Sequence, residues 1–124
     1  MKRLILSMAF FWVHTALLGE SPAVAVNRLY LEVYGICDDC YLRGINFNSL
    51  KLLPGVKITS MQRSDLSYAD LRGLSLRGVD LSGSNLTRAN MTGVDLTGAI
   101  LTDAITDGMI VTDANLRNIW VRKQ

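Results

Sequence analysis

Apolar residues recur at every fifth position through the second half of the chain. Residues 64–118 divide into eleven consecutive fives, and mostly apolar residues occupy the third place. The third-place residues are Leu66, Leu71, Leu76, Leu81, Leu86, Met91, Leu96, Leu101, Thr106, Val111 and Leu116. Helices repeat apolar positions every 3.6 residues and strands every second residue, so a period of five fits neither. A chain that turns a corner every five residues fits it, with each third-place side chain pointing to a common axis.

Four sides of five residues make a coil of twenty, with successive coils stacked at the strand spacing of about 4.8 Å. Backbone groups of each coil then pair with its neighbours, as buried N–H and C=O groups require. The eleven third-place residues are predicted to form the inward core. Asp or Asn is frequent in the second place, where its side chain is expected to bond backbone at the corner or to pair with neighbours one coil away.

The repeat extends towards the N-terminus to Cys40, so the coils are predicted over residues 40–123. A plausible five centred on Leu52 is followed by a slip of one residue at Pro54-Gly55, after which Val56 is in register with Leu76. Proline and glycine together indicate a turn. The slip therefore predicts an irregular corner or small bulge within one continuous stack.

Six fives share a more specific motif. They contain Ala69-Asp70-Leu71, Val79-Asp80-Leu81, Ser84-Asn85-Leu86, Ala89-Asn90-Met91, Val94-Asp95-Leu96 and Ala114-Asn115-Leu116. This motif resembles the A(D/N)LXX signature of the pentapeptide-repeat family. The resemblance implies an all-β fold, a right-handed quadrilateral β-helix, here of about four coils.

The N-terminus has the three parts of a secretory signal peptide. Met1-Lys2-Arg3 is basic, residues 4–18 are almost continuously apolar, and Ala23-Val24-Ala25 has the small-x-small pattern of a cleavage site. We predict a signal peptide over residues 1–25, with a retained anchor as the alternative. The apolar run is shorter than the roughly 20 residues of a spanning helix. Exported relatives are frequent in cyanobacteria, so the expected location is the periplasm, the thylakoid lumen or the extracellular space, without membrane attachment after cleavage.

Residues 26–39 are predicted to cap the first coil. Leu29, Val33 and Ile36 have helical spacing, whereas Leu29, Leu31 and Val33 alternate as a strand would. We favour a short helix over residues 26–36, because the end of a stacked repeat needs a cover.

Cys37 and Cys40 are the two cysteines of the chain. A redox motif of this spacing needs a thioredoxin-like βαβ context, and a zinc site needs further Cys or His ligands. After residue 25 the sequence contains neither a βαβ pattern around the pair nor any further Cys or His. The pair is expected to be a structural clamp or a free pair, and in an exported protein its default state is a disulfide.

Charge and composition favour a binding role over catalysis. Without Lys2, Arg3 and Glu20 the chain keeps eleven of its 13 Lys and Arg and ten of its 11 Asp and Glu. This balance lacks the basic footprint of a nucleic-acid binder, so no nucleic-acid partner is expected. No nucleophile–base pair, metal cluster or phosphate-binding loop is apparent, which predicts no enzyme activity and no cofactor.

The leading interpretation is an exported, non-enzymatic structural or protein-interaction module. One alternative is a DNA mimic that binds gyrase or topoisomerase, as family members that confer quinolone resistance do. Export, near-zero charge and the outward arginines weigh against it. A second alternative is a thiol–disulfide redox protein that uses Cys37 and Cys40.

The last coil departs from the polar second place. Ile100, Ile105 and Ile110 occupy the second place on successive sides, and Trp120 lies one coil above Ile100; we call these four residues the apolar belt. Exposed apolar patches with polar rims are typical of contact sites. The belt is either covered by Trp120 and the C-terminal residues, or it binds an unknown protein partner or a second copy of the chain.

Overall fold

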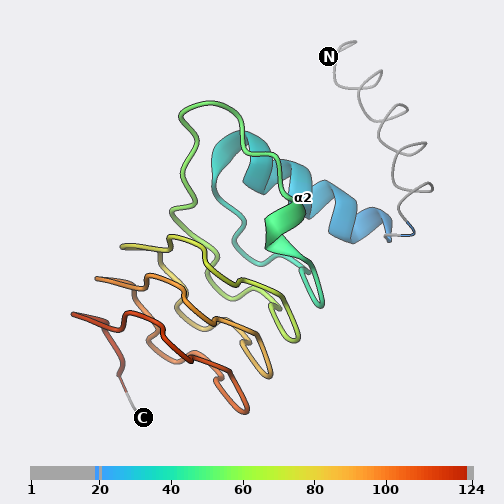
Figure 1. Cartoon of the computed structure of the whole chain (residues 1–124). Coiled ribbons are helices and arrows are strands. Elements are labelled where there is room, and N and C mark those ends of the chain that lie inside the picture. The colour runs from blue at the N-terminus through green and yellow to red at the C-terminus, as the bar shows by residue number, and fades with distance from the viewer. Residues whose placement is uncertain (1–18, 20, 123–124) are drawn as a thin grey trace.

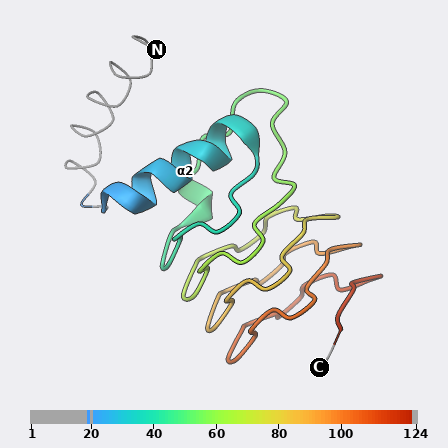
Figure 2. The ribbon, with the colours of Figure 1, turned by 180° about the vertical axis from the view of Figure 1, so that it is seen from behind.

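The computed structural model describes residue 19 and residues 21–122, which form a helix followed by stacked coils (Figure 1). Helix α2 spans Pro22–Tyr34 and lies across the N-terminal end of the stack, and the 3-10 turn η1 spans Phe47–Ser49. Seen from behind, the coils follow one another in chain order away from α2 (Figure 2). No continuous strand is assigned in this part of the chain, and isolated parallel bridges join the coils instead. Among the same residues, no helix has the length and apolarity to cross a membrane.

The bridges repeat every twenty residues from Ser60 onward. The bridged pairs on the four sides of one coil are Ser60–Asp80, Asp65–Asn85, Asp70–Asn90 and Ser75–Asp95. The Leu66 N–H donates to the Asn85 carbonyl at 2.8 Å, and the Asn85 N–H donates to the Ser64 carbonyl at 2.9 Å. Corners end on fifth-place residues with positive φ, such as Gly73 at 70°, which explains the frequent glycine there. The predicted stacking by twenties is confirmed.

Third-place side chains fill the interior of the stack. Those with no more than 5% of their surface exposed are Leu66, Leu71, Leu76, Leu81, Leu86, Met91, Leu96 and Leu101. Each buried Leu stabilises the fold by roughly 1.5–3 kcal/mol, an upper estimate because unfolded chains are partly compact. The prediction of a core position is wrong for Thr106 and Leu116, whereas Val111 packs against the edge of the core cluster. Thr106 is exposed, Val111 is half-buried and Leu116 is 41% exposed, because no described segment covers the last coil.

Helix α2 has a defined start and end. The Ser21 hydroxyl accepts a hydrogen bond from the Val24 N–H at 3.4 Å, and Pro22 occupies the first turn, where its missing N–H costs nothing. Gly35, in the left-handed conformation with φ of 67°, ends the helix. The helix predicted over residues 26–36 therefore begins four residues earlier and ends two residues earlier.

One face of α2 completes the core. Leu31 is fully buried in the same cluster as the coil leucines, and Val24 packs against that cluster. Ala25 is only 2% exposed. The first turn of α2 is thus part of the fold, although the predicted cleavage site after Ala25 falls within the helix.

The first coil is longer than the others. It begins with the bridge between Ile36 and Ser60, which are 24 residues apart. The extra length lies in the loop over residues 50–58, which α2 holds through Glu32: the Lys51 N–H donates to the Glu32 carboxylate and the Leu53 N–H to the Glu32 carbonyl, both at 2.9 Å. The irregularity predicted at Pro54-Gly55 is present as this longer loop.

The loop residues do not continue the inward columns. Leu52 is 38% exposed, and Val56 is half-buried and lies outside the core cluster. The inward positions expected for Leu52 and Val56 are therefore wrong. Bridges start at Ile36 and the inward columns at Cys37, before the boundary expected at residue 40.

Candidate functional site: the C-terminal end of the stack

Second-place Asp and Asn side chains stabilise the corners. Asp95 accepts hydrogen bonds from the backbone N–H and the hydroxyl of Thr97, two residues on. The same pair of bonds joins Asp65 to Ser67, Asp80 to Ser82, Asn85 to Thr87 and Asn90 to Thr92. The corner role predicted for these residues is confirmed.

Three ion pairs neutralise charges on the earlier coils. The hydroxyl and N–H of Thr97, and then Arg77, hold the pKa of Asp95 below its ordinary value of 3.8. Arg72 lowers the pKa of Asp70 in the same way through its side-chain hydrogen bonds, at 2.7 Å for the closest N–O pair. These carboxylates stay ionised near neutral pH as parts of the scaffold.

The third ion pair joins the exposed side chains of Asp39 and Arg63, also at 2.7 Å. A different charged cluster lies at another corner, where the guanidinium of Arg43 is 4.5 Å from the ring centre of Tyr68 and that of Arg88 is 5.9 Å away. The sequence gives no signal for this stack, because its members are distant in the chain.

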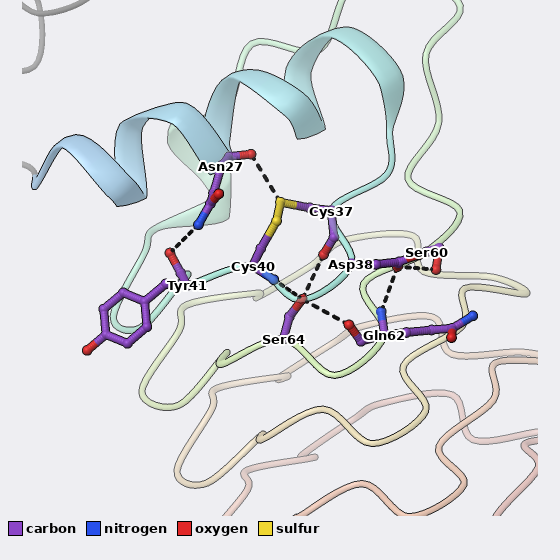
Figure 3. Close-up of a disulfide and its surroundings, with 8 residues drawn as sticks. All are labelled: Asn27, Cys37, Asp38, Cys40, Tyr41, Ser60, Gln62 and Ser64. Atoms are coloured by element: carbon purple, nitrogen blue, oxygen red, sulfur yellow. Dashed lines mark hydrogen bonds between the residues drawn. A yellow bond between two sulfur atoms is a disulfide. The ribbon is translucent and has the colours of Figure 1, made fainter.

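Cys37 and Cys40 lie where α2 meets the first coil (Figure 3). Their Cα atoms are 5.5 Å apart and their sulfur atoms are at bonding distance. The Ser64 hydroxyl donates to the Cys37 carbonyl at 2.7 Å and accepts from the Cys40 N–H at 3.0 Å. Cys37 is 2% exposed and occupies an inward column, and its sulfur is 3.2 Å from the carbonyl of Asn27 in α2. The surroundings favour a structural clamp.

The apolar belt occupies successive sides of the end of the stack. Ile105 is 49% exposed and Ile110 is 46% exposed. Trp120 forms a bridge with Ile100, which is half-buried, and remains 69% exposed. Trp120 therefore extends the side wall and does not cover the interior.

Inside the belt, the end of the core forms a hollow of about 530 Å³. Its apolar lining includes Leu101, Met109, Val111, Leu116 and Val121. Sequence reasoning found the belt but missed this hollow, because the same five-residue pattern describes a covered and an uncovered coil equally well. No group of three or more His, Cys, Asp or Glu side chains that could share a metal ion occurs within residues 21–122.

Sequence reasoning also missed an exposed face on α2. Tyr30 and Tyr34 are 54% and 64% exposed, with ring centres 5.6 Å apart, and Leu29 beside them is 40% exposed. The helical spacing of Leu29, Val33 and Ile36 predicts a face that covers the first coil, but Leu29 is exposed. Leu31 carries that contact instead.

The stacked coils, the twenty-residue register and the apolar interior define a solenoid repeat protein. Residues 64–103 match the family model for pentapeptide repeats, in eight copies. This part of the chain therefore consists of pentapeptide repeats, as the A(D/N)LXX motif predicted. No curated protein matches the chain.

Solved structures similar to this chain include two pentapeptide repeat proteins. The pentapeptide repeat protein Rfr23 from the cyanobacterium Cyanothece 51142 has 23% identity and a TM-score of 0.54, over 82% of this chain and 97% of Rfr23. HetL, a pentapeptide repeat protein involved in heterocyst differentiation regulation from Nostoc sp. strain PCC 7120, has 21% identity and a TM-score of 0.44. That match covers 68% of this chain and 48% of HetL. The similarity to Rfr23 supports the repeat solenoid fold.

Proposed function

We propose that this protein is an exported, non-enzymatic interaction module that binds a protein through the C-terminal end of its stack. The observation that carries this proposal is the contrast between the two ends. Helix α2 covers the first coil, whereas the last coil presents the half-exposed Ile105 and Ile110 around an open apolar hollow. Exposed apolar surface of this kind, rimmed by polar residues, is typical of protein contact sites.

The scaffold behind this surface is, by our proposal, a right-handed quadrilateral β-helix of about four coils. Four bridged sides in each twenty-residue turn support the quadrilateral shape. Handedness comes from the family resemblance. A stiff stack of this kind presents its end as a fixed surface, which lowers the entropic cost of binding.

Export is proposed from two features. One is the tripartite N-terminal sequence, and the other is the Cys37–Cys40 pair at bonding distance, since disulfides persist in oxidising compartments. The periplasm, the thylakoid lumen and the extracellular space all meet this condition. In this proposal the disulfide stabilises the junction of α2 and the first coil and has no redox role.

Site-specific photo-crosslinking in the exporting cell tests the proposed surface. A photoreactive residue placed at Ile105 or Ile110 should give a discrete protein adduct, identified by mass spectrometry. The matched control is Ile36, a second-place isoleucine of the first coil with the same 46% exposure as Ile110. No adduct at Ile105 and Ile110, or equal adducts at all three positions, would exclude a binding surface at this end.

A further inference from the structure

The C-terminal end of the stack is an unpaired backbone edge. In the preceding coil each third-place N–H donates to the next coil, as Leu86 does to the Ile105 carbonyl at 2.7 Å. In the last coil, no backbone partner within residues 21–122 is found for the N–H groups of Thr106, Val111, Leu116 and Val121, or for the carbonyls of Ala104, Met109, Ala114 and Ile119. Such an edge is a template for strands of another chain.

The corners of the last coil carry charges in a simple order. We number its sides along the chain: side 1 is residues 104–106, side 2 is 109–111, side 3 is 114–116 and side 4 is 119–121. Asp107 follows side 1 and Asp113 follows side 2, whereas Arg117 follows side 3 and Arg122 follows side 4. Two neighbouring corners are therefore acidic and the other two are basic.

These four charges are available to a partner. On the earlier coils Arg63, Arg72 and Arg77 are each paired with an aspartate. Among the described residues, none of the four corner charges of the last coil forms an ion pair. Asp103 lies one coil earlier, below the Arg122 corner, and is farther from the end surface.

We propose that the partner is a second copy of this chain, docked end to end about a two-fold axis parallel to sides 2 and 4. The inference rests on the proposed C-terminal binding surface and names its occupant. In this arrangement side 2 of one copy lies over side 4 of the other, and sides 1 and 3 lie over their own counterparts. A two-fold axis makes the contact isologous and closed, so that it ends at a dimer.

Backbone pairing is available in this arrangement where side 2 of one copy meets side 4 of the other. The chain runs around the two ends in opposite senses, so every facing pair of strands is antiparallel. With Ile110 opposite Trp120 of the second copy, the Val111 N–H faces the Ile119 carbonyl, and the Val121 N–H faces the Met109 carbonyl. These two hydrogen bonds form one of the widely spaced pairs of an antiparallel ladder. Aromatic and β-branched residues directly opposite each other also form a favourable cross-strand pair.

Charge pairing selects this axis over the others. Here Asp107 of one copy lies over Arg122 of the other, and Asp113 lies over Arg117. An axis parallel to sides 1 and 3 places Asp107 over Asp113 and the two arginines together. Each diagonal axis places one aspartate over itself and one arginine over itself. Only the proposed axis avoids every contact between like charges, which oppose association.

Charge swaps in the exported protein test the arrangement by sedimentation equilibrium at low salt. The wild type should be a dimer. Asp107→Arg should weaken the dimer about tenfold, since it turns two exposed attractive contacts into repulsive ones. Adding Arg122→Asp should restore the dimer. The double variant Asp107→Arg/Arg117→Asp has the same composition but creates only like-charge contacts, so it should remain weakened.

The outcomes separate the two proposals. A wild type that stays monomeric at the highest soluble concentration refutes self-docking, whereas a crosslink from Ile105 to a different protein would then still support the binding surface. A wild-type dimer whose two double variants behave alike refutes the proposed axis. Circular dichroism of each variant verifies that the coils remain folded.

Discussion

Replacing Gly35 with alanine should detach the N-terminal cap from the coils. Gly35 ends α2 with φ of 67°, and its N–H donates to the Leu31 carbonyl at 2.9 Å. Its carbonyl accepts from the Thr59 N–H at 2.8 Å, so the position is bonded on both sides. A Cβ added here would overlap the carbonyl oxygen of Lys57 in the loop over residues 50–58.

The expected loss in the free energy of unfolding has two parts. A residue other than glycine in the left-handed region costs about 1–2 kcal/mol. Forcing a backbone carbonyl aside in a packed region costs a further 1–3 kcal/mol, approximately, because neither α2 nor the loop can move without losing its hydrogen bonds. The sum, about 2–5 kcal/mol, is a large share of the roughly 5–15 kcal/mol that stabilises a typical domain.

Gly44→Ala is the matched control. Gly44 has nearly the same φ, 69°, but no atom lies within 4 Å of the position that a Cβ would occupy. Urea unfolding followed by circular dichroism should give a loss of about 1–2 kcal/mol for Gly44→Ala and about twice that for Gly35→Ala. Equal losses would refute the close approach of loop and helix and leave backbone strain as the only effect.

Three further predictions follow from burial and charge. Leu86→Ala should lower the free energy of unfolding by about 2–5 kcal/mol, and Leu116→Ala by less than about 1.5 kcal/mol, since Leu116 is 41% exposed. A chain that starts at Val26 should be about 2–3 kcal/mol less stable to urea than one that starts upstream of α2, because it lacks the N-cap and the buried Ala25. Asp95→Asn should reduce the loss of stability on acidification, measured as urea midpoints between neutral pH and pH 3.

The acid prediction depends on the direction of the pKa shift. The pKa of Asp95 is lower in the folded protein than its ordinary 3.8, so its contribution is present above that value and is lost as the pH falls through the folded pKa. Asparagine keeps the corner hydrogen bonds but does not titrate. An unchanged pH profile would contradict this linkage, equal losses at Leu86 and Leu116 would contradict the open end, and an equally stable truncated chain would place residues 21–25 outside the fold.

The stacking could be predicted because the repeat constrains every coil in the same way. A third-place Leu such as Leu86 meets another third-place residue twenty positions away on either side, so the register follows from the period alone. The same logic predicted the corner bonds of Asp80 and Asn90. These features are local or strictly periodic, and the sequence pattern contains both kinds of information.

The two ends could not be predicted in the same way. The start of α2 depends on Ala25 and Val24 finding the core, and the loop depends on Glu32 bonding residues about twenty positions away. Neither contact produces a periodic pattern in the sequence. At the other end, Leu116 fits the repeat as well as Leu86 does, and only the absence of a covering segment in the described chain distinguishes them.

The composition of the last coil has an energetic cost that self-docking would offset. At three of its four sides an apolar residue, Ile105, Ile110 or Trp120, replaces the Asp or Asn that accepts corner hydrogen bonds in the preceding coils. Each missing corner hydrogen bond lowers the stability of the coil by about 0.5–1.5 kcal/mol. An isolated stack gains nothing in return, because these side chains remain about half exposed or more. In the self-docking proposed above, a second copy would cover part of these side chains and pair part of the backbone edge, so the apolar belt would stabilise the docked state at the expense of the free one.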